Sequence, residues 1–323
     1  MIPYINPKNK EKLQEIKEDE HVFVSDSYGQ KYTATDGIFD LIYPDDLREQ
    51  LSSFQNYYDC RASEYEKCLH LTFKTHRLDE KHCRNKFIDE LNLTPNSRVL
   101  EIACGTGRDS TLIADRIPDG ELHLVDISRG MLRICQEKLK SKDIRKFYSL
   151  ANVSKLPYPD DYFDAIYSFG GLGEFPDIKG SLAEMTRVAK KGSKIVVGDE
   201  SIPIWLRNTY FSKVLTKTNP QFLADLPLEY IPVEARNLKV QYVINNVFYL
   251  IDFEVGEGEP TADFDFNIPG IRGGTYRTRY EGELEGVRPK TKEAVLDYCE
   301  KNNLSIHDFL EEIILKKLGN NQK

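Results

Sequence analysis

The sequence has few cysteines and no excess of positive charge. Six cysteines occur among 323 residues, and none forms a C-x-x-C pair or stands at the spacing of metal ligands. We therefore expect no metal site and reduced thiols. Lys and Arg (44) are outnumbered by Asp and Glu (52), which gives a net charge of −8. Because no basic stripe is present, we expect no nucleic-acid partner.

Long apolar runs are also missing. No run approaches the roughly 18 residues that a membrane span needs, and the N-terminal residues lack the apolar core of a signal peptide. We therefore expect no membrane partner and a cytoplasmic location. Apolar residues make up 40% of the chain and charged residues 30%, which is ordinary for a soluble globular protein.

Residues 99–108 predict a strand, a glycine turn and a helix. Four of the first five residues are apolar, as in a strand buried on both faces of a parallel sheet. Gly105 and Gly107 interrupt this run, and Leu112, Ile113 and Ile117 then return at near-helical spacing. Glycines let a ligand approach the backbone, and a helix that begins there offers free N–H groups. This turn should hold a nucleotide-like or carboxylate-bearing ligand.

The details of the turn narrow the choice of ligand. Ser110 stands where a dinucleotide fingerprint has its third glycine, and an acid, Glu101, lies inside the strand. The next predicted strand ends in Asp126, 19 residues after Gly107, where an acid can bind ribose hydroxyls. These features fit both NAD and S-adenosylmethionine.

Two motifs carry a resemblance to a known family. The E-x-A-C-G-T-G sequence of residues 101–107 resembles the glycine motif of class I S-adenosylmethionine-dependent methyltransferases. Asp126-Ile127-Ser128, with Met131 and Leu132, resembles their second motif. Residues 152–164 resemble a third segment, although Asn152 stands where the family often has aspartate. The resemblance covers residues 55–200 and implies S-adenosylmethionine as the cofactor.

The pattern of elements predicts a doubly wound, Rossmann-like α/β fold. Residues 97–200 alternate strand and helix patterns, and residues 240–253 give a strong hairpin signal. We therefore predict a seven-stranded sheet with an antiparallel final hairpin. The expected divisions are an N-terminal β flap (1–46), a methyltransferase domain with N-terminal lid helices (47–255) and a C-terminal extension that ends in a helix pair (256–323).

The resemblance also implies roles for individual residues. The implied cofactor residues are Tyr65, Glu101, Ala103, Gly105, Thr106, Gly107, Asp126, Ile127, Met131, Asn152, Val153, Ser168 and Phe169. Glu174, in a glycine-rich loop, and Tyr57 are the candidate catalytic residues, and Tyr58 is a candidate substrate contact. The alternatives are a solvated loop acid for Glu174 and ordinary core rings for the tyrosines.

A second candidate for substrate binding lies beyond the region of resemblance. In a strand, Arg277 and Arg279 would lie on one face, and arginine forks bind carboxylate or phosphate groups. The alternative is pairing with the chain's many acids.

These features favour a methyltransferase that acts on a small molecule, and the two arginines would suit a substrate with an anionic group. An RNA or protein methyltransferase, an NAD-type oxidoreductase and a non-catalytic nucleotide-binding module are the alternatives. The sequence also leaves open a homodimer through the C-terminal extension.

Overall fold

The computed structural model describes residues 3–18, 21–27, 29, 31–269, 274–282, 284 and 286–319. The chain forms two compact units, Met1–Pro260 and Thr261–Lys323. Within the described residues, no helix combines the length and the apolar character that crossing a membrane requires.

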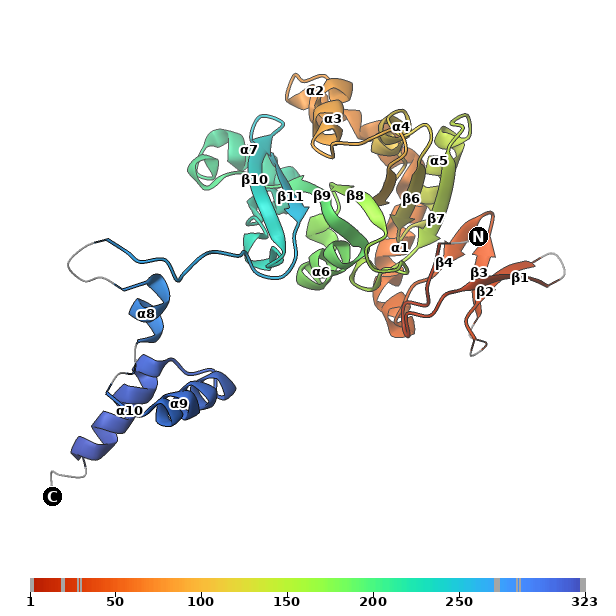
Figure 1. The fold of residues 1–323 in the computed structure, drawn as a ribbon. Helices are drawn as coiled ribbons and strands as arrows, with labels where there is room; N and C mark the ends of the chain where they lie inside the picture. Colours follow the sequence, from red (N-terminus) through yellow and green to blue (C-terminus); the bar gives the residue numbers. More distant parts are fainter. Residues whose placement is uncertain are drawn as a thin grey trace. The chain divides into compact units, whose positions relative to one another are not determined.

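The first unit is built on one mixed sheet, whose strand order is β1-β2-β3-β4-β7-β6-β5-β8-β9-β11-β10 (Figure 1). The strands are β1 (Gln14–Glu18), β2 (His21–Ser25), β3 (Lys31–Thr35), β4 (Ile38–Asp40), β5 (Arg98–Ile102), β6 (Glu121–Asp126), β7 (Arg145–Leu150), β8 (Phe163–Phe169), β9 (Ala189–Glu200), β10 (Ala235–Val243) and β11 (Phe248–Val255).

The central strands follow the predicted doubly wound pattern. Strands β7, β6, β5, β8 and β9 run parallel, and β11 and β10 complete this end of the sheet antiparallel. The predicted total of seven strands is wrong, because the N-terminal strands join the same sheet. Strand β4 pairs parallel with β7, placing Ile38 opposite Tyr148, which extends the sheet to eleven strands.

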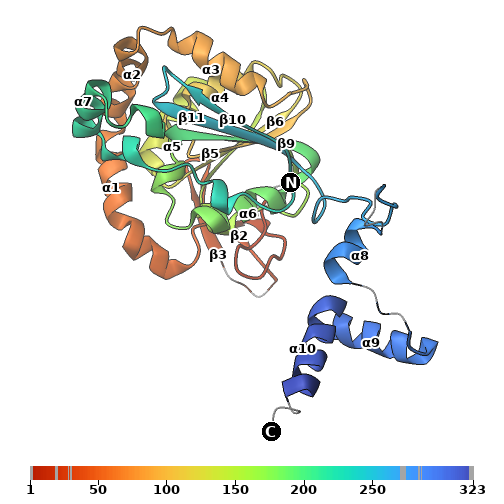
Figure 2. The ribbon, with the colours of Figure 1, turned by 90° about the vertical axis from the view of Figure 1, so that its left-hand side faces the viewer.

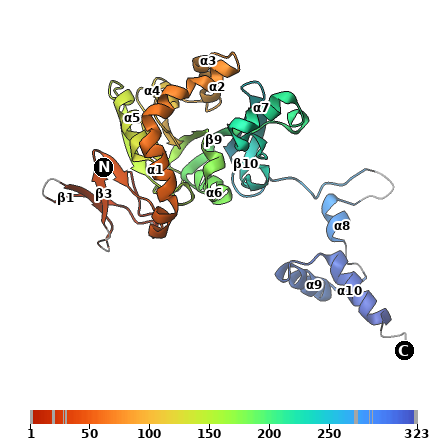
Figure 3. The ribbon, with the colours of Figure 1, turned by 180° about the vertical axis from the view of Figure 1, so that it is seen from behind.

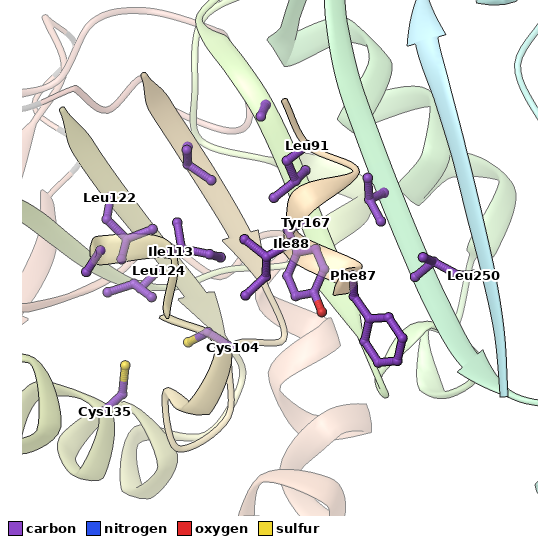
Figure 4. Close-up of a cluster of buried hydrophobic side chains, with 14 of the residues drawn as sticks. Phe87, Ile88, Leu91, Cys104, Ile113, Leu122, Leu124, Cys135, Tyr167 and Leu250 are labelled. Atoms are coloured by element: carbon purple, nitrogen blue, oxygen red, sulfur yellow. The ribbon is translucent and has the colours of Figure 1, made fainter. Parts of the chain in front are cut away.

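Helices cover both faces of this sheet (Figure 2). The helices of the first unit are α1 (Asp45–Cys68), α2 (His70–Thr75), α3 (Glu80–Asp89), α4 (Arg108–Ala114), α5 (Arg129–Leu139), α6 (Ile178–Val188) and α7 (Tyr210–Thr218). Helices α3, α4 and α5 bury apolar side chains in one cluster with the sheet. Figure 4 shows Ile88 of α3 and Ile113 of α4 within it. On the other face, Leu182 and Met185 of α6 pack with Leu100 and Ile102.

Parallel strands bring their carboxyl ends to a common edge of the sheet, so the loops after β5, β6, β7 and β8 gather there. In Figure 3, the long helix α1 crosses the front of the first unit. Its contacts with the loop that opens α5 hold it across this edge. The fold therefore places the glycine turn, Asp126 and Glu174 in one region.

The second unit contains α8 (Tyr276–Glu281), α9 (Pro289–Lys301) and α10 (Ile306–Gly319). Helices α9 and α10 are the predicted helix pair, and Leu284, Cys299 and Ile306 form a small core. The strand predicted around Arg277 is wrong, because these residues form α8. Thr275 begins that helix with a capping box, and Gly282 ends it at φ 83°.

Candidate functional site

One pocket lies at the carboxyl edge of the parallel strands. Its walls come from the ends of β5 to β8, and α1 supplies two rings. The lining residues are Tyr58, Tyr65, Ala103, Gly105, Val125, Asp126, Ile127, Met131, Ala151, Asn152, Val153, Gly170, Gly171, Glu174, Phe175, Pro176 and Ser181. Two of them, Asp126 and Glu174, are acids, and this lining contains no Lys, Arg or His.

The two glycines of the turn have different roles. A Cβ added at Gly105 would meet nothing within 4 Å, so this part of the backbone is open to a ligand. A Cβ at Gly107 would lie 2.6 Å from the Sγ of Cys135, so this glycine lets α5 pack against the turn. Both have positive φ, 52° and 80°, which glycine adopts without strain.

Asp126 lies at the tip of β6 and helps to shape the turn. One carboxylate oxygen accepts a hydrogen bond from the backbone N–H of Gly105 at 2.8 Å, and the other accepts from that of Ser128 at 2.9 Å. Burial raises the pKa of the carboxyl to about 6. Because each carboxylate oxygen has a further lone pair, Asp126 can still accept hydroxyl donors from a ligand.

Asn152 connects the pocket wall to the N-terminal part of the chain. Its amide nitrogen donates to the carbonyl of Tyr43 at 3.1 Å, and its amide oxygen accepts from the N–H of Ser154 at 3.0 Å. The side chain therefore begins the short 3-10 turn that carries Val153 into the pocket.

Two tyrosines of α1 cover the pocket beside Glu174. The hydroxyl of Tyr58 lies 2.6 and 2.7 Å from the two carboxylate oxygens of Glu174, and its ring meets that of Tyr65 edge to face. Burial raises the pKa of Tyr65 to about 12 and also raises that of Glu174. A partly buried carboxylate with a raised pKa is suited to accept a proton.

Hydrogen bonds and an ion pair hold α1 over the carboxyl edge of the sheet at two places. Near its middle, Asp59 accepts from the Ser128 hydroxyl at 2.5 Å and from the N–H of Gly130 at 2.8 Å. Near its end, Glu66 accepts from the Thr106 hydroxyl and pairs with Lys138 at 2.7 Å. The cover is thus bonded to both loops that shape the pocket.

Comparison with known proteins finds similarity in the central part of the chain. Residues 99–192 match a family model described as a methyltransferase domain. The matched residues include the glycine turn, Asp126 and Glu174. This part of the chain is therefore similar to methyltransferase domains.

Curated proteins match a similar region of the chain. The ubiquinone/menaquinone biosynthesis C-methyltransferase UbiE of Cupriavidus metallidurans is 34% identical over 146 residues, or 43% of this chain and 60% of the relative. The protein of the same name from Burkholderia mallei is 35% identical over 144 residues, or 43% of this chain and 59% of the relative. The chain thus spans about 60% of the length of these relatives.

The chain also matches the solved structure of phosphoethanolamine N-methyltransferase 2 of Haemonchus contortus in complex with S-adenosylmethionine. It is 12% identical, has a TM-score of 0.49, and covers 76% of this chain and 71% of its own.

The structure brings many of the predicted site residues together. Those that line the pocket are Tyr58, Tyr65, Ala103, Gly105, Asp126, Ile127, Met131, Asn152, Val153 and Glu174. Their individual roles stay predictions.

Other predicted residues lie outside the pocket lining. Glu101 is buried within β5, and burial, followed by the nearby charge of Asp109, raises the pKa of its carboxyl well above the ordinary value. Thr106 bonds to α1 instead, and Gly107 packs against α5. Ser168 is buried in β8.

Two aromatic candidates also lie outside the lining. The ring of Phe169 stacks between Phe87 and Phe248, at 4.9 and 5.4 Å. Tyr57 is exposed on α1, and its hydroxyl accepts from Arg61 at 2.6 Å.

The two arginines proposed as a substrate handle belong to the second unit. Arg277 donates to Asp265 at 2.8 Å and lies 3.7 Å from Glu281, so its charge is already paired. Arg279 lies on the same short helix.

Several lining residues were not predicted, namely Val125, Ala151, Gly170, Gly171, Phe175, Pro176 and Ser181. Most of them directly adjoin predicted residues, so extending each motif by one or two positions would have found them. Ser181 is different because it comes from α6, and nothing in the local sequence marks its approach to the pocket.

Proposed function

We propose that this chain is an enzyme that transfers a methyl group from S-adenosylmethionine to a small molecule. The observation that carries the proposal is the pocket itself. The open glycine turn, the Asp126 carboxylate, which could bind ribose hydroxyls, and Glu174 all line one space that two tyrosines cover. The match of residues 99–192 to the methyltransferase family supports it.

The residues present fit this cofactor. The backbone at Ala103 and Gly105 would hold its methionine end, Asp126 the ribose hydroxyls, and Met131, Asn152 and Val153 the adenine. The lining carries acids and no cations, which suits a ligand with positive charge. When bound, S-adenosylmethionine supplies a methyl group that is already activated by its sulfonium.

The chain's own residues then have three tasks. The turn and Asp126 fix the donor, the rings of Tyr58 and Tyr65 exclude water, and Glu174 accepts a proton where the acceptor carries one. Orientation supplies much of the rate enhancement in such a transfer, and a positioned base adds roughly 100-fold or more.

We further propose that the acceptor atom is carbon, because the curated relatives are named C-methyltransferases. An anionic group on the substrate finds no cation in the pocket lining. The two arginines that the sequence suggested belong to the second unit, where Arg277 is paired with Asp265.

Calorimetric titration tests the proposed function. S-adenosylhomocysteine should bind with one molecule per chain, and NADH should not bind. The Asp126→Asn variant should have a lower affinity for S-adenosylhomocysteine. Binding of NADH alone would favour an oxidoreductase, and binding of neither compound at millimolar concentration would refute the proposal. If the chain methylates RNA or protein and no small quinol-like acceptor, the proposed small-molecule substrate would be wrong. The proposal that the chain is a methyltransferase would still stand.

We also propose that the C-terminal extension forms a homodimer. Ile314, Leu315 and Leu318 of α10 are exposed large apolar side chains that two copies could bury. Light scattering of the full chain and of a Leu315→Ser/Leu318→Ser variant tests this. A wild-type chain that stays monomeric at high concentration would contradict it. A cytoplasmic location likewise stays a prediction.

A further inference from the structure

Residues 201–224 have an unusual composition for this chain. They connect the end of β9 to the loop before β10, and they contain the 3-10 turn η3 (Ile204–Leu206), α7 and the turn η4 (Pro220–Leu223). The segment contains no Asp or Glu, although acids outnumber basic residues in the whole chain. Its charged side chains are Arg207, Lys213 and Lys217.

The segment carries apolar side chains on two sides. One set packs in the core, and the other is exposed to solvent. On the inner side, Leu206, Leu215 and Phe222 pack with the main apolar cluster. On the outer side, large apolar side chains are strongly exposed. They are Ile204 (75%), Trp205 (69%), Tyr210 (83%) and Val214 (47%). The inner side already anchors the segment, so folding alone does not account for the apolar residues outside.

Two cations stand among these exposed residues. Tyr210, Lys213, Val214 and Lys217 are separated by three or four positions along α7, which places them on one face of the helix. Neither lysine forms an ion pair with any described residue, whereas Arg207 pairs with Asp225 at 2.8 Å. We call Ile204, Trp205 and this four-residue face the α7 patch.

The α7 patch lies at the same edge of the sheet as the pocket. The N–H of Ile202 donates to the carbonyl of Phe222 at 2.7 Å, which ties the segment to the end of β9. A Cβ added at Gly173, the neighbour of Glu174, would lie 3.7 Å from an oxygen of Gln221. Figure 2 shows α7 beside α2 and on the same side of the first unit as α1.

We propose that the α7 patch docks this chain on the surface of an anionic lipid bilayer. Trp and Tyr favour the interface between water and lipid, where their polar tips stay hydrated. Exposed lysines on the same helix face are attracted to anionic head groups. A protein partner would satisfy the apolar side chains equally well, but the absence of acids throughout the segment favours a negatively charged surface.

This docking is peripheral and needs no spanning helix. The sequence led us to expect no membrane partner, and that expectation rested on the absence of an apolar run long enough to span. The docking proposal does not depend on the proposed methyl transfer. If both hold, the pocket edge faces the bilayer, and an apolar acceptor can pass from lipid to the pocket without crossing water.

The chain carries its own probe for the experiment, because Trp205 is its one tryptophan. Full-length protein is titrated with vesicles of phosphatidylcholine containing a third of phosphatidylglycerol, and with vesicles of phosphatidylcholine alone. With the anionic vesicles, the emission of Trp205 should move to shorter wavelength and the protein should sediment with the lipid. Raising the salt concentration should weaken both effects, because salt screens surface charge.

Two pairs of variants test the location of the contact. Lys213→Gln/Lys217→Gln should weaken partitioning about 25-fold, since each cation near such a surface contributes about fivefold. Tyr210→Ser/Val214→Ser should abolish the emission shift. The matched control Lys316→Gln/Lys317→Gln, which removes two cations from α10, should bind as the wild type does.

Three results would overturn the proposal. They are an unchanged Trp205 emission with anionic vesicles, equal losses in the α7 and α10 variants, and an emission shift that follows protein concentration without lipid. The last result would assign the α7 patch to a contact between two copies. None of these measurements requires methyl transfer, so they stand apart from the test of the proposed function.

Discussion

The binding of S-adenosylhomocysteine should depend on the protonation of Asp126. The carboxyl has a pKa of about 6 in the folded chain because it is buried. A ligand that donates its ribose hydroxyls to this group needs the ionised form. Between pH 7 and pH 5 the ligand's own amino group stays protonated and its carboxylate ionised, so the protein provides the main titration.

The size of the effect follows from that pKa. At pH 7 most of the carboxyl is ionised and at pH 5 most of it is protonated, so the dissociation constant should rise about tenfold across this range. Stability should change in the opposite sense. Because the folded-state pKa lies above the ordinary value, the folded chain binds more protons between about pH 4 and 6, so the contribution of Asp126 to stability rises as the pH falls through this window.

Calorimetric titration at pH 7, 6 and 5 measures the affinity, and two variants serve as controls. Asp126→Asn should bind about tenfold or more weakly at pH 7, since a hydrogen bond to a charged group is worth about 1.5–3 kcal/mol, and should lose the pH dependence. Glu174→Gln should keep the pH dependence. A flat wild-type affinity from pH 7 to 5, or an unaffected Asp126→Asn variant, would show that this carboxylate does not bind the ligand.

Three further predictions concern the cover and the turn. Tyr58→Phe and Glu174→Gln should each weaken S-adenosylhomocysteine binding, with a coupling of about 1 kcal/mol in a double-mutant cycle because they share one hydrogen-bonded contact; strictly additive losses would contradict this. Gly107→Ala should destabilise the fold by about 2 kcal/mol or more in urea, since its Cβ would lie 2.6 Å from a thiol sulfur, whereas Gly105→Ala should cost only about 1 kcal/mol for its positive φ; equal losses would refute the distinct roles of the two glycines. Glu66→Gln should speed the release of S-adenosylhomocysteine several-fold in stopped-flow measurements, because it weakens the attachment of the end of α1. A partly exposed ion pair contributes about 1 kcal/mol of stability, which sets this magnitude. An unchanged release rate would argue against α1 as the cover.

The predictions that succeeded depend on short-range patterns. The apolar run before Gly105 and the acid that ends the next strand follow from strand periodicity and chain direction, because parallel strands bring their ends to one edge. This reasoning predicts that Gly105, Asp126 and Glu174 lie in a common region, and all three line the pocket. It did not separate the tyrosines of α1. Tyr58 and Tyr65 lie seven positions apart on one helix face and line the pocket, whereas Tyr57, the predicted catalytic tyrosine, is exposed.

The predictions that failed depend on contacts between distant parts of the chain or on competition between local signals. The hydroxyl of Thr106 bonds to Glu66, forty positions earlier, and no local pattern records that contact. Around Arg277, alternating residues suggested a strand, but the capping threonine before them and Gly282 after them favour one helical turn. The ion pair of Arg277 with Asp265 was among the alternatives considered, and the sequence did not identify the partner.

Because β4 pairs with β7, the segment before residue 47 belongs to the same sheet that carries the pocket. If the chain were shortened to begin at residue 47, the N–H and C=O groups along one side of β7 would lose their partners and become a template for aggregation. The Asn152 amide would at the same time lose the Tyr43 carbonyl that holds it beside the pocket. Ligand affinity would then decline together with solubility, although no predicted binding residue had been removed.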